Sequence, residues 1–238
     1  MTFILSVLIF ISAPVSCLGS GKAEMPIWRE WYTFTRGGIP SGFYVENFHR
    51  KPGLLVIEQV IFERSATGIT ETFVHSEAND NASASPASFY VKKRQLGSVD
   101  VYEGIVSGKE IGIRIHVGQE NKIPATTLEP LKPGVVFGAF VPYFLSKMGT
   151  NKAQQQAKFE SLLEEGDERK FTTAKITAAS VATTLKVGKE TCSEYRLTFN
   201  EIPASWWVTS AGKLCQMLIP SLGSELRIST ESEAKKFL

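Results

Sequence analysis

Histidine is the side chain that most often supplies a general base or a metal ligand near neutral pH, and the sequence has three. They are His49, His75 and His116, and no two form a close pair such as His-Glu-x-x-His. A metal site would have to be assembled from distant segments of the chain. All three fall at the ends or outward positions of expected strands. We therefore expect solvated histidines and predict no metal site and no cofactor.

Serine, cysteine and paired carboxylates are the other candidates for catalysis, and each lacks suitable neighbours. Ser107, within Gly104–Gly108, misses the Gly-x-Ser-x-Gly spacing by one residue and falls in an expected hairpin. Neither Cys192 nor Cys215 has a histidine nearby to activate it. The acidic segment Glu164–Glu168 follows an expected helix and is predicted to be a solvated turn. We predict no catalytic residue and favour a protein that is not an enzyme.

Cys192 and Cys215 could form a disulfide in an oxidising compartment. They fall on the first and third of three consecutive expected strands, Glu190–Phe199, Ala204–Thr209 and Lys213–Ile219. Strands two apart in a sheet lie about 10 Å from each other, which is beyond the reach of a disulfide. The spacing favours free buried thiols, and a different strand order would favour the bridge.

Aromatic side chains are more informative, because they can line an apolar pocket. Tryptophans occur on the first expected strand and, as Trp206-Trp207, on a late one. Adjacent strand residues point to opposite faces, so one of that pair must be covered by a helix, a loop or a ligand. Packing in the core is the alternative role for such residues. The candidate pocket residues are Trp31, Phe137, Phe140, Phe144 and Trp207.

The composition excludes several classes of protein. The 238 residues are 43% apolar and 21% charged, which is enough to form a hydrophobic core and excludes a disordered or collagen-like chain. The net charge is +2, and basic and acidic residues are interspersed rather than clustered as in nucleic-acid-binding proteins. We expect no nucleic-acid partner and one β-rich domain over residues 21–238.

Residues 1–20 have the features of a secretory signal peptide. Phe3–Ile11 is almost wholly apolar, is too short to cross a bilayer, and is followed by small residues. Val15-Ser16-Cys17 also resembles the end of a bacterial lipobox, although Pro14 replaces the usual leucine. In that alternative Cys17 carries a lipid anchor, which is the only contact with a membrane that we expect. We predict an exported protein, in the periplasm or associated with the outer membrane of a bacterium.

The rest of the chain has the patterns of an antiparallel sheet. Apolar residues recur at every second position from Ile111 to Val117 and from Tyr195 to Phe199, as in strands with one buried face. Glycine-rich turns separate the strands at short intervals. Further strands are expected at Trp28–Arg36, Ser41–His49, Leu54–Glu63, Ile69–Ser76, Ser88–Arg94, Val99–Val106, Lys170–Ile176, Ser180–Val187 and Ser224–Ser229. We predict a mainly β (α+β) fold, a curved antiparallel sheet or open half-barrel packed on two or three helices.

A helical insertion is expected at about residues 134–166. Val135–Met148 is apolar nearly all round, and Pro142 should bend or break this helix. A second helix is expected at Lys152–Glu165, where apolar residues fall near one stripe. A third short helix is expected at Glu231–Phe237.

Short motifs resemble those of bacterial exported domains of unknown function, including domains that precede periplasmic transglutaminase-like cores. Trp31-Tyr32 followed by Gly38-Ile39-Pro40-Ser41-Gly42-Phe43 is similar to their opening strand-turn-strand. Ser205–Leu214 is similar to a late hairpin, and residues 222–227 and 230–234 are similar to the final strand and tail. The resemblance implies a curved half-barrel wrapped on helices, comparable to the lipoprotein carriers LolA and LolB, and brings no catalytic residues.

These observations favour a non-enzymatic cell-envelope protein that holds an apolar ligand, a lipid or an acyl chain, between sheet and helices. One alternative is a structural or accessory protein that binds another envelope protein. A second alternative is a hydrolase whose site is assembled from remote residues. The sequence leaves the ligand, the partner and the oligomeric state open.

Overall fold

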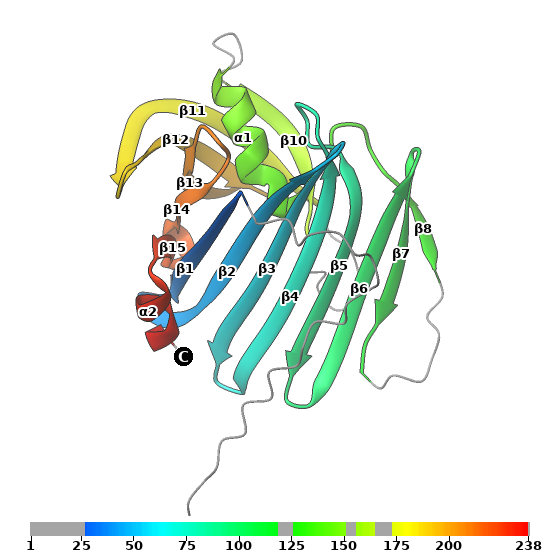
Figure 1. Ribbon diagram of the computed structural model, residues 1–238, viewed down its shortest axis with the longest axis horizontal. Coiled ribbons are helices and arrows are strands. Elements are labelled where there is room, and N and C mark those ends of the chain that lie inside the picture. The colour runs from blue at the N-terminus through cyan, green and yellow to red at the C-terminus, as the bar shows by residue number, and fades with distance from the viewer. Residues whose placement is uncertain (1–26, 119–125, 151–155, 165–172, 238) are drawn as a thin grey trace, which may run out of the picture.

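A computed structural model describes residues 27–118, 126–150, 156–164 and 173–237. The predicted signal peptide and Cys17 lie outside these ranges. The described residues form one large, open sheet with little helix (Figure 1). The mainly β, curved-sheet prediction is confirmed at that level.

The first half of the sheet consists of eight strands that follow one another along the chain. They are β1 (Trp28–Arg36), β2 (Ile39–Lys51), β3 (Leu54–Ser65), β4 (Gly68–Asn79), β5 (Pro86–Gln95), β6 (Ser98–Ser107), β7 (Glu110–His116) and β8 (Thr127–Pro130). The second half of the sheet begins at the opposite edge and continues toward β1. It contains β9 (Val136–Phe137), β10 (Gln156–Leu162), β11 (Thr173–Val187), β12 (Glu190–Phe199), β13 (Ile202–Thr209), β14 (Leu214–Ile219) and β15 (Ser224–Ser229).

The two halves meet at β1 and β15, which pair antiparallel. The order across the sheet is β8 to β1, then β15 down to β9, so β8 and β9 are the two edges. Every neighbouring pair is antiparallel except β9 and β10, which are parallel. The fold is therefore two meanders joined through the first and last strands of the described chain.

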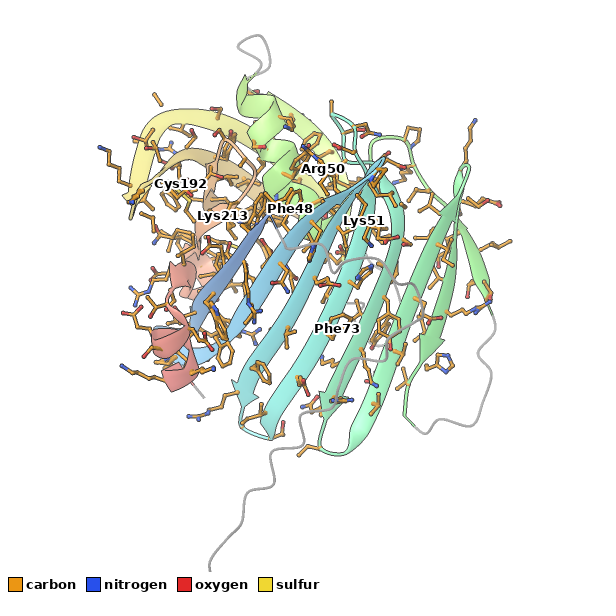
Figure 2. The ribbon with its side chains drawn as sticks, in the orientation of Figure 1. Phe48, Arg50, Lys51, Phe73, Cys192 and Lys213 are labelled. Carbon is orange, nitrogen blue, oxygen red and sulfur yellow. A yellow bond between two sulfur atoms is a disulfide. The ribbon has the colours of Figure 1, made fainter. Side chains whose placement is uncertain are left out.

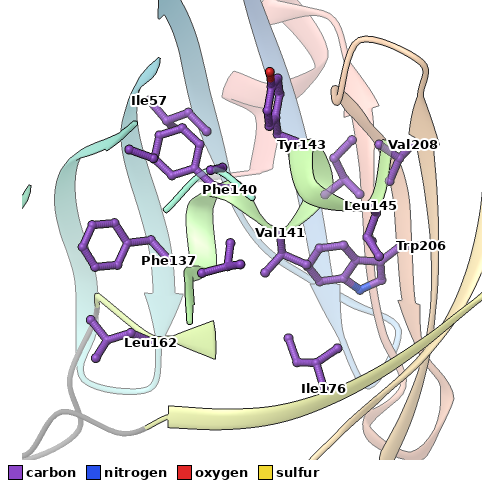
Figure 3. Packing of buried hydrophobic residues seen from close by; sticks show 14 of the residues in the cluster. Ile57, Phe137, Phe140, Val141, Tyr143, Leu145, Leu162, Ile176, Trp206 and Val208 are labelled. Carbon is purple, nitrogen blue, oxygen red and sulfur yellow. The ribbon is translucent and has the colours of Figure 1, made fainter. Parts of the chain in front are cut away.

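One face of the sheet, here called the inner face, carries the main hydrophobic core. Cross-strand rows such as Phe48, Ile57 and Phe89 place their side chains there. The helix α1 (Val141–Thr150) covers this face together with the segment before it. Phe137 and Phe140 of that segment have no exposed surface and pack among residues of both halves of the sheet (Figure 3). The apolar residues alternate along the strands because only one face of most strands is covered in this way.

The helical insertion differs from the prediction in its first part. Val135–Met148 contains β9, a 3-10 turn at Gly138–Phe140 and then α1. Pro142 does not bend or break a helix, because it lies in the first turn of α1, where a missing N–H costs no hydrogen bond.

The predicted helix at Lys152–Glu165 is wrong over its described part, which is the strand β10. Parallel strands need a crossover connection, and α1 is the crossover between β9 and β10. Pairing with β9 and β11 overrides the helical stripe of this segment. The described residues contain two short α-helices, α1 and α2 (Glu231–Ala234), where three helical segments were expected. The predicted C-terminal helix is confirmed, with Thr230 and Glu233 forming a capping box.

The expectation of free thiols is also wrong, because Cys192 and Cys215 form a disulfide. The predicted strand order holds, but the Cα atoms are only 6.5 Å apart. Cys192 pairs with Thr209, the last residue of β13, and the register of β13 with β14 shifts between Trp207 and Val208. The bridge therefore crosses the irregular end of the middle strand, where the spacing of a regular sheet does not apply. Cys192 and Lys213 lie in the same corner of the molecule (Figure 2).

We expect the double variant Cys192→Ala, Cys215→Ala to lose roughly 3 kcal/mol of unfolding free energy, because the bridge closes a loop between residues 23 apart in sequence. Urea titration of the mature protein with and without reductant measures this loss. Reductant should shift the midpoint of the wild type and leave that of the double variant unchanged. Two titratable thiols in the unreduced wild type would contradict the bridge.

Candidate functional site

Two adjoining cavities lie on the inner face of the sheet. The first has a volume of about 400 Å³ and the second about 600 Å³. Tyr44, Met217 and Leu226 line both, so the two cavities adjoin, and together they are here called the trough. Its remaining lining in the first cavity is Glu46, Gln59, Val74, Gly138, Ala139, Pro142, Leu163, Glu164, Trp206 and Leu214. In the second it is Phe34, Thr35, Arg36, Ile61, Glu63, Ile219, Leu222, Ser224 and Glu225.

Both halves of the sheet build the trough. The first meander supplies β1 to β4, the second supplies β13 to β15, and the turn before α1 closes one side of the first cavity. Most lining side chains are aliphatic or aromatic, and the polar ones gather at separate places. An arrangement of this kind can hold an apolar chain and orient a polar group.

Glu46 is the first buried carboxylate of the trough. It lies on β2 between Tyr44 and Phe48, at a position whose neighbours face the core, and it is only 6% exposed. Gln59 Nε2 donates a hydrogen bond of 2.8 Å to Glu46 Oε2, and Trp28 Nε1 donates one of 3.5 Å to Oε1. Burial raises the pKa of Glu46, and these two hydrogen bonds oppose that rise.

Glu164 is the second buried carboxylate, and the predicted solvated turn is wrong at this residue, which is 5% exposed. Ser76 Oγ donates a hydrogen bond of 3.0 Å to Glu164 Oε1, and the backbone N–H of Ala139 donates one of 3.3 Å to the same oxygen. Burial raises the pKa of Glu164 to about 7, although these hydrogen bonds act in the opposite direction.

The parallel pair of strands explains why Glu164 reaches this place. Phe137 of β9 pairs with Leu162 of β10, and parallel strands end at the same edge of a sheet. Ala139 and Glu164 each follow the paired residue by two positions, so the carboxylate meets the backbone of the turn before α1. A Cβ added at Gly138 would lie 2.9 Å from Glu164 Oε2, so this position has little room for a side chain.

Neither carboxylate has a basic partner among the described residues. The ion pairs of that part of the chain involve other acids. Lys213, the one lysine that is largely buried there, contacts Glu30 at 2.8 Å and Glu190 at 2.9 Å. The first cavity thus contains two acids in apolar surroundings without a neutralising charge.

Three of the predicted pocket residues belong to the core around α1. Phe137 and Phe140 are fully buried, and Phe144 packs against Phe159 with ring centroids 4.6 Å apart. None of the three lines the trough. A role for them in ligand binding stays a prediction.

The two predicted tryptophans also lie outside the trough. Trp31 is on the opposite, outer face, where it packs with Phe43 and Phe62 beneath Ala234 of α2. Trp207 is partly buried, and its neighbour Trp206 is the one that faces the core and lines the first cavity. One tryptophan of the pair thus points away from the core, as alternation requires.

Sequence reasoning missed Glu46 and Gln59, although a signal was present. Glu46 interrupts the run of inward-facing residues Tyr44 and Phe48, and a charged residue at such a position is expensive unless it has a function or a partner. Glu164 gave no such signal, because its burial depends on pairing between β9 and β10.

His49 and His75 lie on the outer face, where both contact Glu58 rather than being fully solvated. His75 Nδ1 lies 3.3 Å from Glu58 Oε1, and its Nε2 lies 3.4 Å from Glu77 Oε1. The hydrogen bond to Glu58 raises the pKa of His75 and lowers that of Glu58. Ser88 donates to Glu77 and not to His75, so the network contains no serine–histidine pair for nucleophilic catalysis. Within the described ranges, no three acidic, histidine or cysteine side chains are placed to hold a metal ion.

Comparison with known proteins identifies no family for this chain. No family model matches the chain, and no curated protein matches it. A solved structure of a DUF1089 family protein (PA1994) from Pseudomonas aeruginosa is similar over 86% of this chain and 98% of its own. The two share 11% sequence identity and a TM-score of 0.45. None of the helices in the described part of the chain has the length and apolar character needed to span a membrane.

We expect Glu164 to make stability depend on pH. The folded protein holds this proton more tightly than the unfolded chain, in which the pKa is 4.5, so stability falls as the pH rises from about 4.5 to about 7. The loss is roughly 3 kcal/mol. The variant Glu164→Gln should match the wild type near pH 5 and exceed its unfolding free energy at pH 8. Urea titrations at both pH values measure the difference, and parallel pH profiles for the two proteins would contradict it.

Proposed function

We propose that the protein binds a lipid or another molecule with an apolar chain in the trough and holds it without chemical conversion. The observation that carries this proposal is the pair of adjoining, mostly apolar cavities that share Tyr44, Met217 and Leu226. Their volumes fall within the range of ligand sites in proteins, about 300–1,000 Å³. Each methylene group transferred from water into such a site contributes about 0.8 kcal/mol to binding.

The surroundings of the trough support a binding role. Its apolar lining includes Phe34, Ile61 and Ile219, so a chain in the second cavity meets side chains rather than backbone polar groups. A long, open apolar surface on a protein often marks a ligand or partner site. We propose further that the protein is exported, and the Cys192–Cys215 disulfide supports this, because disulfides persist in oxidising compartments.

The hydrolase alternative has one observation in its favour. Glu46 and Glu164 share a cavity, and the pKa of Glu164 is close to 7, as a general acid requires. No histidine, cysteine or serine lines that cavity among the described residues, and most of its surface is apolar. These features suit retention of a ligand better than hydrolysis. The accessory-protein alternative predicts instead that the trough binds no small molecule.

A fluorescent apolar probe tests the proposal. We expect the neutral dye N-phenylnaphthylamine to bind saturably to the wild type and to be displaced by lipids. The variant Met217→Trp fills the part shared by both cavities and should weaken dye binding about tenfold or more, which is at least about 1.4 kcal/mol. Ile219→Trp, which narrows the second cavity alone, is a second blocking variant.

The matched control is Ile105→Trp, because Ile105 is 67% exposed and lines neither cavity. It should bind the dye as the wild type does, and thermal unfolding should show that all three variants are folded. Equal dye affinity in the blocking variants and the control would contradict the proposal. Turnover of an ester or glycoside that stops in Glu164→Gln would favour the hydrolase.

A further inference from the structure

We propose that the trough prefers a cationic amphiphile, a long-chain amine whose ammonium group occupies the first cavity, which the Glu46 and Glu164 carboxylates line. This inference rests on the proposed function, since it names the polar group of the ligand that the trough would hold. It follows from the charge, the hydrogen-bonding capacity and the aromatic lining of that cavity.

The charge of the first cavity is unbalanced. Both carboxylates are more than nine-tenths buried and line the same cavity, and neither forms an ion pair within the described part of the chain. Buried charges are costly unless they are paired. A ligand ammonium supplies the missing partner in surroundings where charge–charge interactions are strong.

The carboxylates also retain hydrogen-bonding capacity. Each oxygen of Glu46 accepts one hydrogen bond, from Trp28 or from Gln59, whereas a carboxylate can accept about four in all. Ser76 and the Ala139 backbone donate to Glu164 Oε1, and the backbone N–H groups of Gly138 and Glu164 also act on this carboxyl group, so Glu46 has the larger spare capacity. An ammonium group carries three donors and no acceptor, which matches acids that still have acceptor sites. Such charge-assisted hydrogen bonds are about twice as strong as neutral ones.

The aromatic lining is an independent reason to expect a cation. Tyr44 and Trp206 both line the first cavity, which the two acids also line. The faces of tyrosine and tryptophan rings attract ammonium groups, and the attraction is strongest where water is excluded.

The lining of the trough disfavours an anionic ligand. Among the residues that the structure describes, no lysine or arginine lines the first cavity. Arg36 lines the second cavity, but it is paired with Glu63 and its side chain is 62% exposed. A fatty-acid carboxylate would therefore meet two acids at one end and an already paired, solvated arginine at the other.

Calorimetry with three ligands of equal chain length tests the inference. We expect dodecylamine to bind at pH 8 roughly tenfold more tightly than dodecanol, and dodecanoate to bind more weakly than the alcohol. The preference for the amine should shrink at pH 5.5, where Glu164 is protonated, while dodecanol affinity should stay constant. The amine itself remains protonated across this range.

The variants Glu46→Gln and Glu164→Gln, singly and together, should remove the preference and leave dodecanol binding unchanged. Glu71→Gln is the matched control, since Glu71 is an acid on the outer face that pairs with Arg94. Equal binding of amine and alcohol by the wild type, or a preference that survives in the double variant, would overturn the inference while the proposed function stands. Binding of none of the three ligands would instead overturn the proposed function. If the double variant does not fold, the test is whether each single variant loses part of the preference for the amine over dodecanol.

Discussion

The antiparallel pairing of β1 with β15 is the contact on which the rest of the structure depends. It joins two meanders whose remaining strand pairs are all internal to one meander or the other. The Tyr32 hydroxyl crosses this join and donates a 3.0 Å hydrogen bond to the carbonyl of Leu214, and Tyr32 has no exposed surface. Without the join there would be two separate sheets and no trough, because Phe34 and Ile61 come from one meander and Met217 from the other. Contacts between residues so distant in sequence form slowly during folding.

Because the two meanders are joined, the inner face carries both the hydrophobic core and the trough. Phe137, Phe140 and their neighbours fill part of it (Figure 3), and the first cavity lies beside Pro142 of α1 and the turn before it. Beyond the reach of α1, the large side chains of β1, β2 and β14 face one another across the trough. Because one short helix covers only part of a wide sheet, apolar surface is left over, and leftover apolar surface is what a ligand with a hydrocarbon chain can bury.

The pattern of apolar and polar residues predicted most strands, but it did not predict features that depend on contacts between distant segments. The bounds of β1, β12 and β15 agree with the sequence-based expectation. The alternation of apolar and polar residues that marks a strand is a property of consecutive residues, so it can be recognised in the sequence alone. The strand β10 was missed because only its partners, β9 and β11, stabilise it as a strand. The disulfide was missed because it depends on an irregularity in β13. Trp206 and Trp207 were separated correctly by face, but which of them lines a cavity depends on the sheet as a whole.

Glu164 shows how a site can be hidden from sequence and still be determined by simple geometry. It begins the charged segment Glu164–Glu168, and its burial follows from one parallel pair of strands and the crossover helix between them. That crossover places the backbone N–H of Ala139 beside the carboxylate, and β4 contributes the Ser76 hydroxyl. Two donors therefore fix the acid before any ligand arrives, which lowers the ordering cost of binding. A buried acid held this firmly, with no cation beside it in the described chain, conflicts with the apolar pattern around it, and such conflicts are expected where a protein binds something.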